Sequence, residues 1–337
     1  MKRRKFIYHS SLLAVSAASG LSMRRGPQIM TVNGPVDSEK IGVTLSHEHI
    51  LVDFIGANQY DPSRWEQDQV VEALLPYLIE LKQLGCSTFV DCTPAFLGRD
   101  PVLLKALSRK SGLNIITNTG YYGAVNNKYL PKIAINSSAQ DLANLWVNEY
   151  ENGIDGTGIR PGFIKISVNP ESLSDLHRKL VEAAAITHLH TGLTITSHTG
   201  PSGPAFEQLD ILQKLGVHAS AFVWVHAQNE KDKTAYFNAI RKGAWISLDG
   251  VQESNMHEYV EVLQMIKKRG FLDQILISQD AGWYEPGKPW NGPVRDYTVI
   301  FKQLIPKLKI SGFNQKNIKQ LFEINPQKAF TIKVRNL

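Results

Sequence analysis

The chain has 337 residues, of which 43% are hydrophobic and 20% charged, and its formal net charge is +6. These values are typical of a globular protein. Since no apolar run reaches the ~20 residues of a membrane-spanning helix, the sequence predicts a soluble protein without a stable membrane anchor.

The first 25 residues resemble an export signal. Residues 1–7 are basic, residues 12–21 are weakly apolar, and the small residues from Ala17 to Gly20 could be the cleavage site. Arg3 and Arg4 resemble the twin-arginine export motif, although Lys2 stands where Ser or Thr is usual. We therefore expect export, with the periplasm as the destination. The alternatives are a basic tail on a cytoplasmic protein, or translation that starts at Met23 or Met30.

The positive charge is concentrated in this segment. Residues 1–20 contain four basic residues and no acid, so their removal would reduce the net charge from +6 to +2. We therefore expect no nucleic-acid partner. The two cysteines, Cys86 and Cys92, fall in one predicted strand about 20 Å apart, which is too far for a disulfide, so we expect buried thiols.

After residue 40 the sequence repeats one pattern, in which a short apolar, β-branched run is followed by an amphipathic stretch of helical period. The predicted strands lie at residues 42–52, 87–93, 114–121, 161–168, 193–199, 222–227, 244–250 and 275–280. The predicted helices lie at residues 66–84, 100–111, 139–151, 172–189, 204–215, 230–242, 256–269 and 296–309, with a terminal helix and tail at 314–323 and 326–333. Eight such units without a break favour an α/β fold, a single (β/α)8 TIM barrel over residues 26–337, and no glycine-rich dinucleotide turn follows the first strand.

His47 and His49 lie near the end of the first predicted strand, in the segment Thr44-Leu-Ser-His-Glu-His-Ile-Leu-Val-Asp53. Because side chains alternate along a strand, both imidazoles point the same way, about 7 Å apart along the chain. Two imidazoles on one face can bind one metal ion, although a pair of structural histidines is the alternative.

Further polar residues stand on other predicted strands. Lys165 interrupts an apolar strand, where a free ammonium would be costly. His198, His226 and Asp280 each end a strand. Active sites of such barrels lie at the C-terminal ends of the strands. Each residue alone could be a cap or a core residue, but together they predict a divalent metal site.

This ordered set resembles the phosphotriesterase family of the amidohydrolase superfamily, and the resemblance runs from about residue 28 to the end. It implies two divalent metal ions. The implied ligands of one metal are His47, His49 and Asp280, those of the other are His198 and His226, and a carboxylated Lys165 bridges both. Zinc is the favoured metal, and Mn, Co or Fe would suit the same ligands.

The resemblance also implies a reaction. A hydroxide held between the metals would attack the substrate, because metal ions lower the pKa of bound water to about 7, and Asp280 would accept and relay the proton. A homodimer is common in the family.

The substrate pocket departs from known members. Asn229 and Gly250 stand where triesterases carry an Asp and a His of a proton relay, and Gly250 also replaces the Arg of related lactonases. Tyr122 matches the lactonase tyrosine. After Asp280 comes a long aromatic loop, residues 281–295, in which Trp283, Tyr284 and Arg295 are candidate substrate-binding residues; a plain surface loop is the alternative.

The sequence therefore predicts a binuclear metal hydrolase acting on a small-molecule carboxylic ester, in particular a lactone. A hydrolase of phosphotriesters, phosphodiesters or amides is the second hypothesis. The third is an exported metal-binding barrel without catalytic activity.

Overall fold

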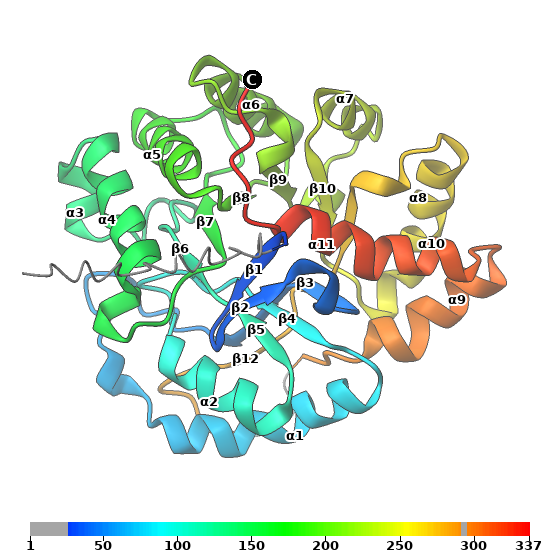
Figure 1. Cartoon of the computed structure of the whole chain (residues 1–337), viewed down its shortest axis with the longest axis horizontal. Coiled ribbons are helices and arrows are strands. Elements are labelled where there is room, and N and C mark those ends of the chain that lie inside the picture. Colours follow the sequence, from blue (N-terminus) through cyan, green and yellow to red (C-terminus); the bar gives the residue numbers. More distant parts are fainter. Residues whose placement is uncertain (1–25, 291–294) are drawn as a thin grey trace, which may run out of the picture.

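The computed structural model describes residues 26–290 and 295–337. The predicted export signal, residues 1–25, lies outside the described residues. Figure 1 shows the strands at the centre of the molecule and the helices around them. Strands and helices alternate along the chain, as the sequence predicts.

The central strands are parallel and follow one another around the centre. They are β3 (Thr44–Leu51), β4 (Thr88–Asp91), β5 (Asn114–Ile116), β6 (Asn118–Thr119), β7 (Phe163–Ser167), β8 (Thr194–His198), β9 (Phe222–Val225), β10 (Trp245–Leu248), β11 (Ile275–Ile277) and β12 (Gly282–Tyr284). All eight predicted strands are confirmed, and the strand predicted at 114–121 is divided into β5 and β6.

The helices mostly coincide with the predicted segments. They are α1 (Gln67–Gln83), α2 (Pro101–Ser111), α3 (Lys132–Asn136), α4 (Ala139–Asn152), α5 (Asp175–Thr191), α6 (Ser202–Lys214), α7 (Thr234–Lys242), α8 (Met256–Lys268), α9 (Ile305–Ile310), α10 (Gln315–Lys319) and α11 (Asn325–Phe330). Two π-helical turns, Ile300–Leu304 and Gln320–Ile324, lead into α9 and α11. The short helix α3 and the strand β12 are not predicted from the sequence.

The backbone ladders form two parallel sheets and do not close into one barrel, which differs from the prediction. Their orders are β11-β10-β9-β8-β7-β6 and β12-β3-β4-β5. The chain passes directly from one sheet to the other between β5 and β6. Between β3 and β11, side-chain hydrogen bonds replace part of the backbone hydrogen bonding. The buried Glu48 carboxylate accepts hydrogen bonds from Ser278 Oγ (2.7 Å) and from the backbone N–H groups of Gln279 (3.0 Å) and Ala281 (2.7 Å).

Two layers of apolar side chains hold this arrangement. The larger cluster contains strand residues such as Phe89, Ile164 and Trp224 together with helix residues such as Leu78 of α1, so it lies between strands and helices. The smaller cluster lies among the strands. Its members are Ile29, Ile41, Val90, Cys92, Ile116, Phe163, Val223, Val225, Trp245, Leu276, Ala329 and Phe330.

An N-terminal hairpin, β1 (Gln28–Thr31) and β2 (Gly34–Asp37), also missed by the sequence analysis, lies beside α11 across one end of the strands (Figure 1). Its Ile29 belongs to the same buried cluster as Phe163 at the start of β7 and Phe330 of α11, whose ring centroids lie 5.6 Å apart. Side chains alternate along a strand, so Phe163, Lys165 and Ser167 lie on one face of β7. Phe163 is at the end that the hairpin covers, and the polar Lys165 and Ser167 lie toward the opposite end.

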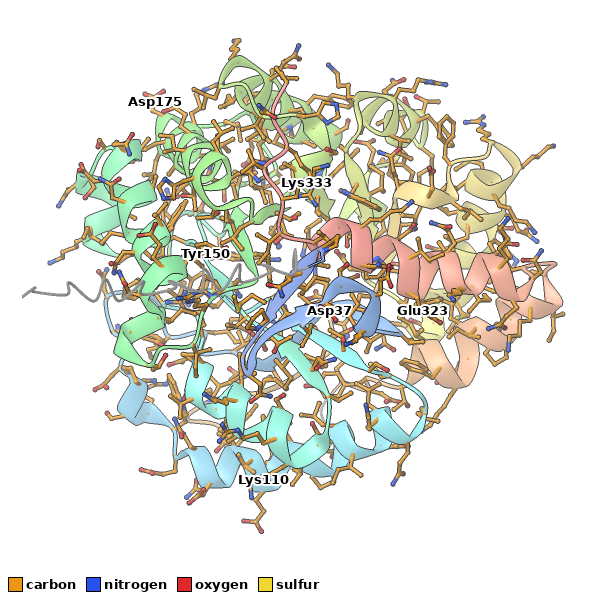
Figure 2. The ribbon with its side chains drawn as sticks, in the orientation of Figure 1. Asp37, Lys110, Tyr150, Asp175, Glu323 and Lys333 are labelled. Atoms are coloured by element: carbon orange, nitrogen blue, oxygen red, sulfur yellow. The ribbon has the colours of Figure 1, made fainter. Side chains whose placement is uncertain are left out.

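Charged side chains stand at the periphery of the molecule. Figure 2 shows the charged side chains of Lys110 on α2 and Asp175 on α5 at the periphery, where both are exposed. Cys86 and Cys92 are free and buried, as predicted. Within the described residues, no helix is both long and apolar enough to cross a membrane.

Candidate metal centre

The ends of β3, β7, β8 and β9 and the loop after β11 bring the predicted ligands together. Between Leu45 and Glu48 the pairing of β3 with β4 shifts, as in a β-bulge, and bulges near functional sites re-aim side chains. His47 lies within this shift and His49 just after it, and their ring centroids are 5.3 Å apart. The pairing of the two imidazoles therefore agrees with the strand geometry expected from the sequence.

His47, His49 and Asp280 form one compact group of donor atoms. Asp280 Oδ1 lies 3.0 Å from His49 Nε2 and 3.5 Å from His47 Nε2, and the three ligand atoms all fall within 4.8 Å of one another. Asp280 has a left-handed backbone, with φ at 50°. A non-glycine residue in this region is strained, and such strain concentrates at functional sites.

Lys165, His198 and His226 lie beside this group. Lys165 is 1% exposed, and its Nζ is 3.3 Å from His47 Nε2. The rings of His198 and His226 are 4.3 Å apart, and that of His226 is 5.1 Å from His47. No carboxylate of the described residues lies within ion-pair distance of Lys165 Nζ, so a buried ammonium would lack a counter-ion there.

Asp249, which the sequence analysis missed, connects the two groups. It follows β10, is 0% exposed, and its carboxylate accepts hydrogen bonds from His47 Nδ1 (3.1 Å) and His226 Nδ1 (2.7 Å). Ser247 Oγ (2.6 Å) and Gln228 Nε2 (3.1 Å) also donate to it. Because its oxygens are occupied by these donors, Asp249 orients the imidazoles and leaves their Nε2 atoms free for a metal.

The signal for Asp249 was present in the sequence. It lies inside the predicted strand 244–250, at a strand end like the other site residues. The sequence analysis considered only the following position, Gly250.

Burial and charge set the protonation of these groups. Burial, reinforced by Lys165, lowers the pKa of His47 to about 3. Burial also lowers the pKa of His198 well below its usual value. Burial opposes ionisation of Asp280, but the hydrogen bond from His49 and the neighbouring histidines outweigh it and hold the pKa of Asp280 far below its usual value. Burial lowers the pKa of His226, but the Asp249 carboxylate outweighs burial and raises it overall. The site therefore offers neutral imidazoles at His47 and His198 and an ionised carboxylate at Asp280, which are the forms that bind metal ions.

This donor set fits divalent metal ions. His47, His49 and Asp280 could hold one ion, and His198 and His226 lie beside them. Lys165 lies next to His47 and lacks a counter-ion, so conversion of its ammonium to an anionic carbamate would both remove the unpaired charge and add oxygen ligands.

The candidate substrate residues lie at different distances from the centre. Tyr122 and Trp283 line a cavity of about 130 Å³ together with the histidines. Tyr122 Oη lies 3.1 Å from His198 Nδ1, and burial raises the pKa of this phenol, so it stays a neutral donor. The Trp283 ring stands edge-on to His49, with centroids 5.9 Å apart. Their roles in substrate binding stay predictions.

Tyr284 and Arg295 lie further out. Tyr284 pairs with Leu51 of β3 and stacks on Trp290, away from the small cavity. Arg295 lines a second, polar cavity of about 450 Å³ that also touches His198, His226 and Asp280. Asn229 and Gly250 line this polar cavity as well, so the positions of the triesterase relay face the site but carry no titratable side chain.

Comparison with known proteins identifies the chain's relatives. A model of the phosphotriesterase family matches residues 27–330. The chain is 30% identical over 313 residues to an aryldialkylphosphatase of Saccharolobus solfataricus, a match that covers 88% of this chain and 97% of the relative. It is 28% identical to the phosphotriesterase homology protein of Escherichia coli, with 86% and 98% covered. It is 23% identical to an N-acetyltaurine hydrolase of Xenopus tropicalis, with 91% and 98% covered.

Proposed function

Because the chain belongs to the phosphotriesterase family, we propose that it is a metal-dependent hydrolase that cleaves a carboxylic ester, with a lactone as the preferred substrate. The observation that carries this proposal is the convergence of the four imidazoles and Asp280 around the buried Lys165. Relatives with hydrolytic names, an aryldialkylphosphatase and an N-acetyltaurine hydrolase, support the reaction class.

We place this chemistry on a (β/α)8 barrel with two divalent ions, zinc being favoured, and a carboxylated Lys165 between them. The succession of parallel strands from β3 to β11 supports the barrel, and a helix or loop separates each strand except β5 from the next. When bound, the metals would supply Lewis-acid polarisation of the substrate and a lowered pKa of water.

The chain's own residues would orient the substrate and move the proton. Asp280 is ionised and 27% exposed toward the cavities, so its free oxygen can accept the proton of the attacking water. Tyr122, a neutral phenol, can donate to the oxygen of the scissile ester. Val52, Leu97 and Trp283 exclude water from one side of the small cavity.

Two features favour an ester over a phosphotriester. The positions that carry the triesterase relay are Asn229 and Gly250, neither of which can transfer a proton. The hydroxyl of Tyr122 lies 3.1 Å from His198 Nδ1, where it can donate to an ester oxygen. The aryldialkylphosphatase relative supports phosphotriester hydrolysis as the second candidate, and the N-acetyltaurine hydrolases make an N-acyl amide a necessary comparison.

The test is a substrate panel with metal-loaded protein, comparing kcat/KM for lactones, aryl esters, phosphotriesters and N-acyl amides. We expect the highest value for a lactone. A phosphotriester or an amide preferred over every ester would overturn the ester assignment. Metal analysis of the same protein should give about two ions per chain, and a chain without metal would overturn the hydrolase itself.

A further inference from the structure

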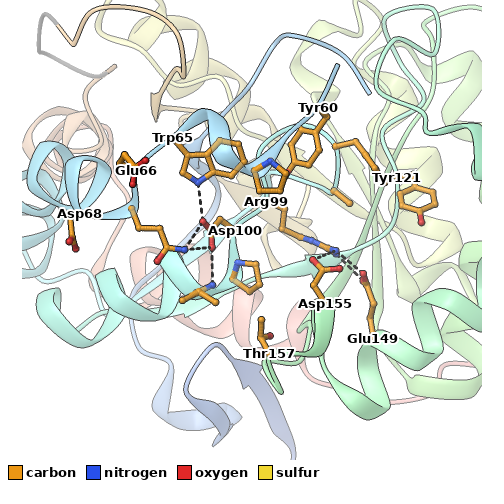
Figure 3. Close-up of a pocket in the computed structure, with 16 residues that line it drawn as sticks. Tyr60, Trp65, Glu66, Asp68, Arg99, Asp100, Tyr121, Glu149, Asp155 and Thr157 are labelled. Carbon is orange, nitrogen blue, oxygen red and sulfur yellow. Dashed lines mark hydrogen bonds and ion pairs between the residues drawn. The ribbon is translucent and has the colours of Figure 1, made fainter. Parts of the chain in front are cut away.

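A third, larger pocket lies outside the metal centre. It has a volume of about 740 Å³, within the range of small-molecule sites. Residues from the loop after β3, the start of α1, the loop before α2 and the end of α4 surround it. Figure 3 shows Trp65 and Tyr60 on one side of this pocket, and Arg99, Asp155 and Glu149 on another. We call it the aromatic pocket.

One wall is a row of aromatic rings. The ring centroid of Tyr60 lies 6.0 Å from that of Trp65 and 5.6 Å from that of Phe96, and Phe96 lies 5.7 Å from Tyr121. Phe96 has a left-handed backbone, with φ at 64°, which a bulky side chain rarely adopts. The fold thus holds the Phe96 ring in the row at a cost in backbone strain. Aromatic faces carry negative potential and attract organic cations.

The charges around the pocket are mostly negative. The charged residues that line it are Glu66, Asp68, Asp100, Glu149, Asp155 and one base, Arg99. Glu149 neutralises Arg99 through two hydrogen bonds, from Nη1 (2.9 Å) and Nη2 (2.7 Å). Asp100 is occupied by the Trp65 indole N–H (3.0 Å) and by the first turn of α2.

Three carboxylates therefore remain to act on a ligand. Glu66, Asp68 and Asp155 are exposed at the rim, and the nearest base in an ion pair with any of them is Arg99, 3.9 Å from Asp155. A pocket with this surplus of negative charge repels anions and concentrates cations.

The floor of the pocket has an unsatisfied donor. The Arg99 side chain is 3% exposed, and its Nε has no hydrogen-bond partner among the described residues. A buried donor without an acceptor is costly, and because Arg99 lines the pocket, a ligand oxygen that hydrogen-bonds to its guanidinium would reduce that cost.

We propose that the aromatic pocket is a binding site for an organic ammonium compound that carries an acceptor oxygen, such as an amino alcohol. The ammonium would lie against the aromatic row under the rim carboxylates, and the oxygen would face Arg99. Strong hydration of a small metal cation would not suit the aromatic wall, whereas an alkylated ammonium loses little on leaving water.

The pocket lies back to back with the metal centre. Phe96 and Tyr121 line the aromatic pocket, while the adjacent Leu97 and Tyr122 line the small cavity at the histidines. The proposal does not depend on the hydrolase activity, because binding is measured without turnover.

The experiment is a titration of the full-length, metal-loaded protein with choline, followed by calorimetry and by ligand-observed NMR. We expect saturable binding with a Kd of about 1 mM or tighter, weakened by added salt. Tetramethylammonium, which lacks the oxygen, should bind more weakly, and inorganic phosphate should not compete.

The variant that tests the site is Glu66→Gln/Asp68→Asn/Asp155→Asn, which should weaken choline binding about tenfold. Asn suits position 155, because Asp155 has φ at 49° and Asn tolerates the left-handed region. Asp273→Asn is the matched control, an exposed acid that does not line the pocket, and it should leave binding unchanged.

Two results would overturn the proposal. One is no saturable binding up to about 20 mM choline, and the other is equal binding by wild type and the triple variant. Equal affinity for tetramethylammonium would overturn the assignment of the acceptor oxygen. None of these results bears on ester hydrolysis, which the substrate panel tests separately.

Discussion

Two cavities share one wall in this protein, and they are built in different ways. The small cavity at the histidines is lined by residues from the ends of the central strands, whereas the aromatic pocket is lined by loops and helix ends. The first gathers metal-binding nitrogens around a buried lysine, and the second gathers rings and carboxylates. Neighbouring residues, Leu97 beside Phe96 and Tyr122 beside Tyr121, face opposite sides. Adjacent residues therefore line two different cavities. Substitutions in one cavity should change metal binding and ester hydrolysis, and substitutions in the other should change choline binding.

The variant Lys165→Met should give the largest difference between the effects on the metal centre and on the aromatic pocket. Methionine has a similar shape but neither the charge nor the ability to form a carbamate, so we expect loss of metal and a decrease in kcat/KM of about a thousandfold or more. Choline binding in the aromatic pocket should be unchanged. Metal analysis by mass spectrometry and the ester assay measure the first effects, and calorimetry measures the last.

The same variant tests whether Lys165 has a structural role. A buried ammonium without a carboxylate partner destabilises the fold, and an apolar replacement of similar volume is often neutral or stabilising. The metal-free Lys165→Met protein should therefore unfold at a Tm equal to or above that of the metal-free wild type. A Tm lower by many degrees would assign Lys165 to the fold and not to the metal.

A smaller effect is expected from Asp249→Asn. An amide accepts through one oxygen only, so it cannot receive hydrogen bonds from His47 and His226 as the carboxylate does. Loss of such an orienting partner typically weakens metal binding 10- to 100-fold, and chelator competition would measure it. Glu149→Gln is the matched control on the other side of the wall, where it removes the charge beside Arg99. If both variants bind metal as tightly as wild type, Asp249 does not position the ligands.

The difference between the cavities also explains what the sequence could predict. His47, His49, Lys165, His198, His226 and Asp280 were identifiable because alternation along a strand and the ends of parallel strands fix where side chains meet. The strands were predictable because short apolar, β-branched runs that alternate with amphipathic stretches are typical of buried parallel strands between helices. Asp249 obeyed the same rule and was overlooked beside Gly250.

The aromatic pocket had no comparable signal. Tyr60 and Trp65 lie in a loop, and Phe96 reaches the row only through a left-handed backbone that no local pattern indicates. The contact of Arg99 with Glu149 joins residues fifty positions apart. The hairpin β1–β2 was missed for a related reason: its strands have four residues each, too few to show a period. The sheet is interrupted between β3 and β11, where Ser278 donates a hydrogen bond to Glu48. These two residues are far apart in the sequence, so no local pattern could predict the interruption.

The smallest expected difference is between substitutions of the two adjacent tyrosines, Tyr121 and Tyr122. Tyr122→Phe removes a hydroxyl that lies 3.1 Å from His198 and leaves the ring that fills the small cavity, so metal content and Tm should not change. If this hydroxyl donates to the ester in the transition state, kcat/KM for the preferred ester falls about tenfold, the value of one neutral hydrogen bond. Tyr121→Phe makes the same chemical change one residue away, on the aromatic pocket, and should leave ester hydrolysis unchanged. The two variants differ only in which cavity loses the oxygen. If both keep the kcat/KM of the wild type, the Tyr122 hydroxyl does not donate to the ester, and if both lose activity equally, the loss comes from the shared wall and not from this hydroxyl.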